Sequence, residues 1–131
     1  MLFRSVLGSG PECVVFDEVD AGIGGEAAVA VATALADLGV RRQVLVVTHL
    51  AQVAARASTH IHVSKAVKAG RTMASAATLS GESRVQEIAR MLLARGANPS
   101  LADREGVTPL GHAKRRGFAG MVRILAAAGA R

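Results

Sequence analysis

Two short apolar runs, residues 13–17 and 43–48, flank an alanine-rich stretch and constrain the fold more than any other feature of the sequence. Both runs are rich in Val and have the length of buried strands. The stretch between them, 26–38, is predicted to be a helix, with Glu26 in its first turn and Gly39 as its end. Strands joined through a helix are expected to be parallel with a right-handed crossover. The fold class predicted for this part is therefore α/β.

Further elements follow along the chain. Residues 50–56 are expected to form a short helix. The runs 60–65 and 71–79 favour two strands of an antiparallel hairpin, with a turn at 68–70. A helix over 82–94 is predicted, with the apolar residues Val85, Ile88, Ala89, Leu92 and Leu93 on one face.

The chain has 131 residues, which indicates one domain or one small domain with an appendage. Seven Lys or Arg balance seven Asp or Glu in residues 1–83, whereas residues 84–131 hold nine basic and three acidic residues. This shift indicates a boundary. Cys13 is the only cysteine, and we expect it to be a buried, reduced thiol in a cytoplasmic protein. No apolar run reaches the roughly 18 residues of a membrane span, so no membrane role is predicted.

Acidic and polar residues stand where each predicted parallel strand ends. Asp17 and Glu18 end the first strand, and Thr48 and His49 end the second. Ligands bind α/β sheets at the carboxyl ends of their strands. Phosphoryl transfer needs an acid for Mg²⁺, a group that orients the attacking water and a polar contact to the γ-phosphate. Asp17, Glu18 and His49 are the candidates for these three roles, in that order.

The stretches "CVVFDEVDAGIGGEAA", "RRQVLVVTHLAQVAA" and "SRVQEIARML" resemble the C-terminal part of the RecN family of bacterial DNA-repair ATPases, which are SMC-like members of the ABC ATPase superfamily. The resemblance covers about residues 1–92 and implies a partial ABC-type ATPase sheet that uses ATP and Mg²⁺ and acts on DNA. By this resemblance, the Walker B pair is Asp17, the metal ligand, and Glu18, and the switch histidine is His49. The nucleotide-contacting D-loop would include Asp20, Gly22, Gly24 and Gly25. Ala51 stands where the family usually has Pro.

The phosphate-binding loop GxxxxGK[ST] of the family does not occur in this sequence. The family's ABC signature helix would lie just before the first strand, and the chain is expected to begin inside it, at residues 1–7. We therefore expect ATP hydrolysis only if a P-loop comes from elsewhere, and the expected partners are DNA, a P-loop-bearing chain or a second copy in a homodimer. His60 and His62 share a strand face, but no third metal ligand is evident, so surface histidines are the favoured interpretation.

Residues 93–131 resemble an ankyrin repeat. "GA" at 96–97 recurs at 129–130, which is the 33-residue ankyrin period. Thr108 is the expected cap of a first helix with Pro109 at its first position, and Gly117 is its expected end. Gly111 stands where the repeat usually has His, with His112 one place late, which predicts weakened internal hydrogen bonds. The junction between the two parts is expected within 84–96.

Three functions remain open on these grounds. The first is a fragment of a RecN-like ATP-dependent DNA repair and recombination protein, which carries Walker B, the D-loop and the switch histidine. The second is an ankyrin-type module that binds a protein partner through residues 93–131. The third is an inactive truncated fusion product.

Overall fold

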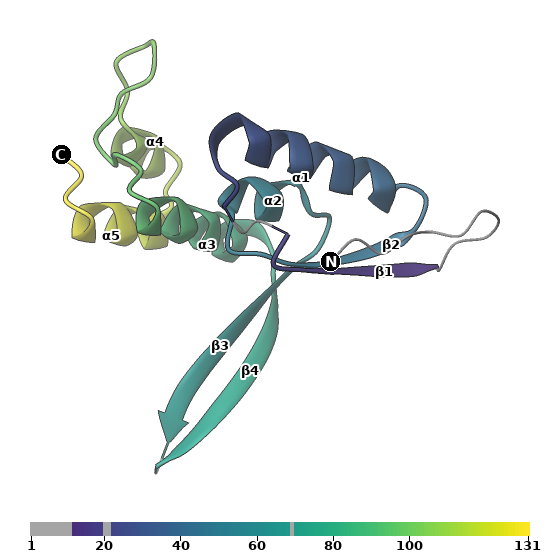
Figure 1. Cartoon of the computed structure of the whole chain (residues 1–131). Helices are drawn as coiled ribbons and strands as arrows, with labels where there is room; N and C mark the ends of the chain where they lie inside the picture. The colour runs from purple at the N-terminus through teal and green to yellow at the C-terminus, as the bar shows by residue number, and fades with distance from the viewer. Residues whose placement is uncertain (1–11, 20–21, 69) are drawn as a thin grey trace. The chain divides into compact units, whose positions relative to one another are not determined.

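The computed structural model describes residues 12–19, 22–68 and 70–131 and divides into two compact units, Met1–Arg56 and Ala57–Arg131 (Figure 1). Residues 1–7 and Asp20, which carry two of the predictions above, lie outside the described residues. The predicted junction at 92/93 falls inside the second unit. It stays a prediction, because it concerns ancestry whereas the units are defined by packing.

The first unit is a strand–helix–strand followed by a short helix. Its elements are β1 (Cys13–Asp17), α1 (Gly25–Gly39), β2 (Gln43–Val47) and α2 (Ala51–Arg56). The two strands are parallel, in a register that runs from Cys13 opposite Gln43 to Asp17 opposite Val47. The predicted elements and their parallel pairing are confirmed, and the right-handed crossover stays a prediction.

Small side chains on α1 make the core of this unit. Ala28 is 0% exposed, and it packs with Ala32 against Leu50 and Val53 at the start of α2. Alanine at these positions lets the helix approach its neighbours closely and also has the highest helix propensity. Ile23, Leu35 and Val46 complete the cluster.

The prediction that both strands are buried is wrong for one face of the sheet. Val14, Phe16, Val44 and Val46 are half-buried, whereas Val15 is 56% and Val47 is 55% exposed, and Leu45 is similar. Cys13 lies on the same exposed face, so its predicted burial is also wrong. The physical reason is that a parallel sheet needs cover on both faces, and α1 and α2 of this unit supply cover for one.

The second unit begins with a long hairpin. β3 (His60–Lys68) and β4 (Arg71–Leu79) pair antiparallel, with His60 opposite Leu79 and Lys68 opposite Arg71. The predicted hairpin is confirmed, and its first strand is three residues longer than expected. Ser64 and Ser75 face each other in the ladder with their hydroxyl oxygens 2.8 Å apart. Every residue of β4 except Leu79 is exposed, so the ribbon is held mainly by its own ladder.

Three helices follow the hairpin. They are α3 (Gly81–Ala94), α4 (Pro109–Arg115) and α5 (Ala119–Ala127). Ser80 and Ser83 form a capping box at the start of α3. At α4, the Thr108 hydroxyl accepts a hydrogen bond of 3.2 Å from the Gly111 amide, which confirms the predicted cap.

The three helices share one hydrophobic cluster. Leu110 and Ala113 of α4 pack against Met121 and Leu125 of α5, and Ala89 and Leu93 of α3 join them. Two residues of the predicted apolar face of α3, Val85 and Leu92, are 44% and 41% exposed. The buried residue is Met91 instead. Periodicity locates an apolar stripe but not which of its edges the neighbouring helices cover.

The ends of α3 and α5 have the same hydrogen-bond geometry at an offset of 33 residues. The Ala97 amide donates to the Leu92 carbonyl at 3.1 Å, and the Ala130 amide donates to the Leu125 carbonyl at 3.0 Å. Gly96 and Gly129, one residue earlier, have φ of +82° and +84°. This is the left-handed C-terminal motif that glycine favours. The same geometry ends α4, where the Phe118 amide donates to the Ala113 carbonyl at 3.0 Å after Gly117, so the ankyrin-like repeat stays a prediction.

Candidate functional site

The parallel register brings the polar residues that follow β1 and β2 to one edge of the sheet. Asp17 is the last residue of β1 and lies opposite Val47, the last residue of β2. Glu18 and Thr48 come next along each strand, and His49 follows Thr48. The predicted acidic pair and the predicted histidine thus leave the sheet at the same end.

Glu18 has an unusual backbone conformation. Its φ is +51°, and among the described residues no other non-glycine residue has a positive φ. The left-handed region costs an ordinary residue about 1–2 kcal/mol, because Cβ approaches the neighbouring carbonyl. Residues held in this way often belong to functional sites. The chain leaves the strand abruptly at this residue, and the Glu18 side chain is exposed.

A glycine-rich loop connects β1 with α1. Gly22 and Gly25 have φ of +75° and +56°, so a side chain at either position would be strained. Gly24 is the N-cap of α1 and has an extended backbone. Among the described residues, a Cβ on any of the three glycines would meet no atom of a more distant residue within 4 Å. The loop therefore needs these glycines for backbone freedom at the first and third positions, and its surface is open.

Thr48 and His49 connect β2 with α2. The Thr48 hydroxyl accepts a 3.0 Å hydrogen bond from the Leu50 amide, which turns the chain into the helix. Leu50 is buried against α1, so the core fixes the place where His49 leaves the sheet. His49 itself is exposed.

The described part of the chain contains no group of three His, Cys, Asp or Glu side chains that could hold a metal ion. Asp17 is an exposed carboxylate and would be one protein ligand. Mg²⁺ commonly binds through one or two carboxylates, several waters and the phosphates of its substrate. Asp17 therefore fits the part of a single Mg²⁺ ligand and does not suit a metal held by protein alone.

The two histidines of the hairpin lie near charged residues of α3. His62 Nε2 is 3.8 Å from Glu87 Oε1, and Glu87 also accepts two hydrogen bonds from Arg90, at 2.8 and 2.6 Å. The Arg90 hydrogen bond lowers the pKa of Glu87. Burial lowers the pKa of His60, with a further contribution from the charge of Arg84. These contacts join the root of the hairpin to α3, and the interpretation of His60 and His62 as surface histidines stays a prediction.

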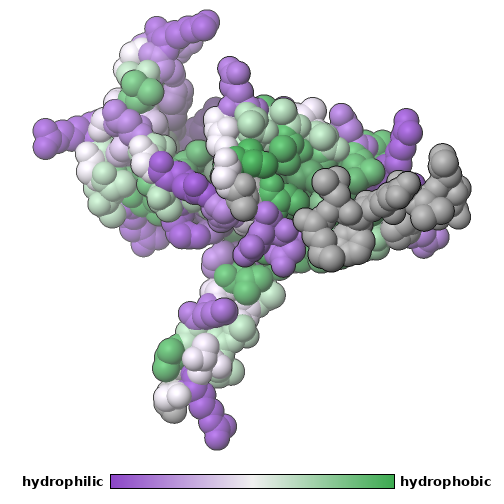
Figure 2. Space-filling model, viewed as in Figure 1, coloured by the Kyte–Doolittle hydropathy of each residue, from purple (hydrophilic) through white to green (hydrophobic). Residues whose placement is uncertain are grey.

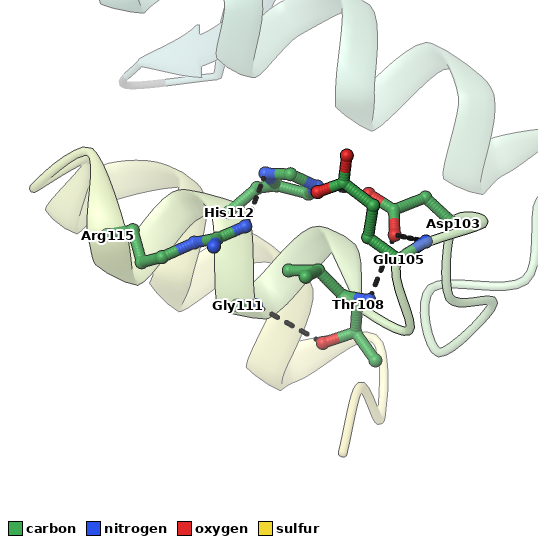
Figure 3. A network of polar contacts seen from close by, with 7 residues as sticks. Asp103, Glu105, Thr108, Gly111, His112 and Arg115 are labelled. Atoms are coloured by element: carbon green, nitrogen blue, oxygen red, sulfur yellow. Dashed lines mark hydrogen bonds and ion pairs between the residues drawn. The ribbon is translucent and has the colours of Figure 1, made fainter.

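A polar network precedes and joins α4 (Figure 3). Asp103 Oδ1 accepts 2.9 Å hydrogen bonds from the Glu105 and Val107 amides, and Asp103 Oδ2 is 2.6 Å from His112 Nε2. The His112 hydrogen bond is the main reason that the pKa of Asp103 is lowered. His112 thus makes a close contact, and the predicted weakening of the repeat's internal hydrogen bonds stays a prediction. One turn of α4 still carries the imidazole to the loop.

A contact between α3 and α5 was missed by sequence reasoning. Glu82 Oε1 accepts a 3.2 Å hydrogen bond from the Gly120 amide and a 2.8 Å hydrogen bond from Gln86 Nε2. A carboxylate at the start of α5 also complements the helix dipole. A Cβ on Gly120 would stand 2.0 Å from Gln86 Nε2. A glycine in the first turn of a helix was the one signal in the sequence for this close approach.

Comparisons with known proteins match a large part of the chain to proteins of one name. The DNA repair protein RecN of Deinococcus radiodurans is 60% identical over 88 residues, which is 67% of this chain and 16% of that protein. RecN of Bacillus subtilis is 44% identical over 79 residues, 60% of this chain and 14% of that protein. The chain is RecN-like over this segment. No protein-family profile matches it.

RecN of Treponema pallidum is 43% identical over 123 residues, which is 92% of this chain and 22% of that protein. A match that leaves out so little of the chain includes both strand ends of the candidate site. It also extends well past residue 93, so most of the C-terminal segment has a counterpart in that RecN. The chain spans about a sixth to a fifth of the length of these relatives. No helix in the described ranges is both long and apolar enough to cross a membrane.

Proposed function

We propose that the chain is a RecN-like piece of an ATP-hydrolysing DNA repair protein that supplies the Walker B acids and the switch histidine. In this proposal Asp17 holds Mg²⁺ through its water shell. Glu18 orients and polarises the attacking water, and His49 donates a hydrogen bond to the γ-phosphate. Asp20 and the glycines at 22, 24 and 25 form the D-loop that borders the nucleotide. The metal supplies charge neutralisation at the phosphates.

The observation that carries this proposal is the register of the parallel pair. Because Asp17 lies opposite Val47, the residues that follow both strands leave one edge of the sheet. This is the edge at which α/β proteins bind their ligands. The RecN match supports the assignment, since the matched residues of Treponema pallidum RecN include both strand ends.

Two local features agree with a working site. Glu18 has a positive φ, a conformation that costs stability and so needs a reason. Asp17 has the exposure expected of a Mg²⁺ ligand that shares the ion with phosphates and water.

The proposal requires a phosphate-binding loop that holds the phosphates of ATP. A phosphate-binding loop would come from a second polypeptide or from a second copy of a longer form, because GxxxxGK[ST] is absent from this sequence. DNA is the proposed target because the matched relatives are DNA repair proteins, and the cytoplasm is the proposed location. Recombination is a further proposed process, from the resemblance of the sequence to the RecN family.

A chimera tests the catalytic assignment. In Deinococcus radiodurans RecN, the matched segment is replaced by the corresponding 88 residues of this chain. We expect the chimera to hydrolyse Mg-ATP in a phosphate-release assay. Glu18→Gln should lower kcat by about a hundredfold or more, the usual contribution of a positioned general base. Asp17→Asn should raise the Mg²⁺ concentration needed for half-maximal activity.

Glu26→Gln is the matched control. Glu26 is an exposed carboxylate in the first turn of α1, eight residues after Glu18. The substitution Glu26→Gln should leave kcat within about twofold of the value for the unsubstituted chimera. If Glu18→Gln hydrolysed ATP as fast as Glu26→Gln, the proposed role of Glu18 would be wrong.

A protein-interaction module is the second candidate for residues 93–131. It is supported by the 33-residue period in the sequence and by the hydrophobic cluster that α3, α4 and α5 share. α4 and α5 also carry an open recess of about 460 Å³, lined in part by Ala119 and Val122. Val122→Glu should abolish capture of a defined partner from source cells, whereas Val40→Glu, at an exposed site of the first unit, should not.

A further inference from the structure

We propose that a groove between α3 and α4 binds an amphipathic helix of a partner protein, with apolar side chains toward α3 and an acidic side chain toward Arg116. This inference rests on the second candidate function, the interaction module, and names the class of its partner. It concerns a surface other than the recess at Ala119 and Val122. On the face drawn in Figure 2, apolar side chains over the helices of this unit are bordered by hydrophilic ones.

The α3–α4 groove has a volume of about 440 Å³, which is within the range of sites that hold a ligand. Its lining comes from α3, α4, α5 and the loops at their ends, so it lies wholly within the second unit. Most of the lining surface is apolar. Lining residues used below are Val85, Ala89, Leu92, His112, Arg116 and Leu125.

Two apolar side chains of α3 line the groove and are not covered by it. Val85 is 44% and Leu92 is 41% exposed. Together with Ala89 they have i, i+4 and i+7 spacing, which places all three on one stripe of the helix. This is the spacing through which an amphipathic helix and a helical groove contact each other.

An internal comparison indicates what kind of element would cover this stripe. At the 33-residue offset of the sequence repeat, Leu92 corresponds to Leu125 of α5. Leu125 is only 5% exposed and packs with Leu110 and Ala113 of α4. The helix α5 thus follows a helix that covers it, whereas α3 follows the strand β4. A helix that lay on α3 as α4 lies on α5 would bury Leu92.

The backbone of the partner segment also favours a helix. The groove lining belongs to helices and the loops at their ends, and none of it comes from a strand edge of the described residues. An extended segment would place unpaired amide and carbonyl groups against apolar side chains, which is costly. A helix forms these hydrogen bonds within itself.

The charges around the groove favour an acidic partner. In the loop before α4, Asp103 is already hydrogen-bonded to His112, with Oδ2 and Nε2 2.6 Å apart (Figure 3). The other end of α4 carries three consecutive cations at 114–116. Arg116 lines the groove, and within the described residues its guanidinium has no hydrogen-bond or ion-pair partner. A carboxylate at that end of the groove would form a charge-assisted hydrogen bond with it.

A phage-displayed library of helical peptides, each of about four turns, tests the proposal with the full chain immobilised. The library randomises one face of the helix. Peptides that the unsubstituted chain retains and Leu92→Ser does not should share apolar residues at i, i+4 and i+7 and an adjacent Asp or Glu. A retained set without the acidic residue, or no peptide whose retention depends on Leu92, would overturn the proposal.

Fluorescence anisotropy with one selected peptide then measures the apolar contacts. Leu92→Ser and Val85→Ser should each weaken binding about tenfold, because each removes apolar surface that the peptide covers. Leu101→Ser is the matched control, since Leu101 is an exposed leucine of the same unit and does not line the groove. It should leave the affinity within about twofold. Equal losses in the three variants would contradict the groove as the site.

The acidic contact has its own comparison. Arg116→Gln should weaken binding about threefold at low salt and less at high salt, because the pair is exposed. Arg123→Gln removes an exposed cation of α5 outside the groove lining and should have no effect. A peptide with Gln in place of its acidic residue should bind the unsubstituted chain and Arg116→Gln equally. Equal losses with Arg116→Gln and Arg123→Gln would mean that net charge alone governs binding.

Urea denaturation checks that the variants fold. If both groove serine variants were unstable, the comparison of Arg116→Gln with Arg123→Gln would decide the outcome, since both side chains are exposed. Sedimentation of the chain alone tests another occupant. A dimer that Arg116→Gln and Leu92→Ser both dissociate would assign the groove to a second copy and overturn the proposal.

Hydrogen–deuterium exchange gives a readout that needs no substitution, because bound peptide should slow exchange in α3 and α4 and leave α1 unchanged. Protection of α1 alone would place the peptide elsewhere. Failure of these tests, with partner capture still lost in Val122→Glu, would leave the interaction module in place and remove only the groove. Capture that Val122→Glu did not affect would remove the recess and leave the peptide measurements valid. None of these experiments uses ATP.

Discussion

Glu18 keeps a backbone conformation that glycine adopts more easily. Replacement by glycine removes the crowding of Cβ at φ +51° and adds entropy to the unfolded chain, so the two effects partly offset each other. We expect Glu18→Gly to raise the free energy of unfolding by up to about 1 kcal/mol, measured by urea denaturation. Glu18→Gln keeps the Cβ and should leave stability unchanged. A less stable glycine variant would mean that the conformation is not strained.

Asp103 makes the stability of the second unit sensitive to acid. Its pKa is lowered, mainly by the hydrogen bond with His112, so the folded state favours the charged carboxylate. The contribution is complete above the unfolded pKa of about 4 and is lost as the pH falls through the lower folded pKa. Between pH 5 and pH 2, Asp103→Asn should lose less stability than the unsubstituted chain in denaturant titrations. Parallel losses in the two proteins would contradict this role.

At the scale of single residues, the sequence predicts the site better than its surroundings. Asp17, Glu18 and His49 lie at one sheet edge because a strand–helix–strand pattern leaves few alternatives for where strands end. Asp103 escaped prediction because its bonds depend on the conformation of a loop that contains no regular period. The positive φ of Glu18 escaped because glutamate is not a residue that indicates a turn.

At the scale of elements, Gly120 sets how closely α5 approaches α3. Gly120→Ala adds helix propensity, worth about 1 kcal/mol, but displaces the Gln86 amide and its bond to Glu82. We expect the single substitution to leave stability unchanged or lower. In a Gln86→Ala background the same substitution should stabilise by about 0.5–1 kcal/mol, since the obstacle is gone. A double-mutant cycle with no coupling would show that the two helices do not meet at this point.

The type of an element was predictable where the apolar pattern ends at a residue that breaks helices or strands. The parallel pair, the hairpin and the helices of the second unit all follow from apolar runs bounded by Gly, Ser or Pro. Burial was less predictable. Val15 and Leu45 look like core residues, yet they are exposed, because burial depends on how many other elements cover the sheet. The pattern of apolar residues in the strands contains no information about how many elements cover the sheet.

At the scale of the whole molecule, the two units should respond separately to damage in one core. Leu125 is buried among α3, α4 and α5, so Leu125→Ala should destabilise the second unit by about 2–5 kcal/mol. Hydrogen–deuterium exchange should then quicken in 81–131 and not in α1. Leu101→Ala changes an exposed leucine of the same unit and should alter neither. Faster exchange in α1 with Leu125→Ala would mean that the units unfold together.

The single thiol gives chemical access to the uncovered side of the β1–β2 sheet. Cys13 is exposed and shares that face with Val15, Leu45 and Val47. Its reaction with a maleimide dye therefore reports whether a polypeptide has come to rest there. Rapid labelling shows that the face is uncovered. Labelling that slows when a P-loop-bearing chain is added shows that this chain binds to the face. The reactivity of Cys13 therefore reports whether the chain has bound the P-loop-bearing partner that the proposed ATP hydrolysis requires.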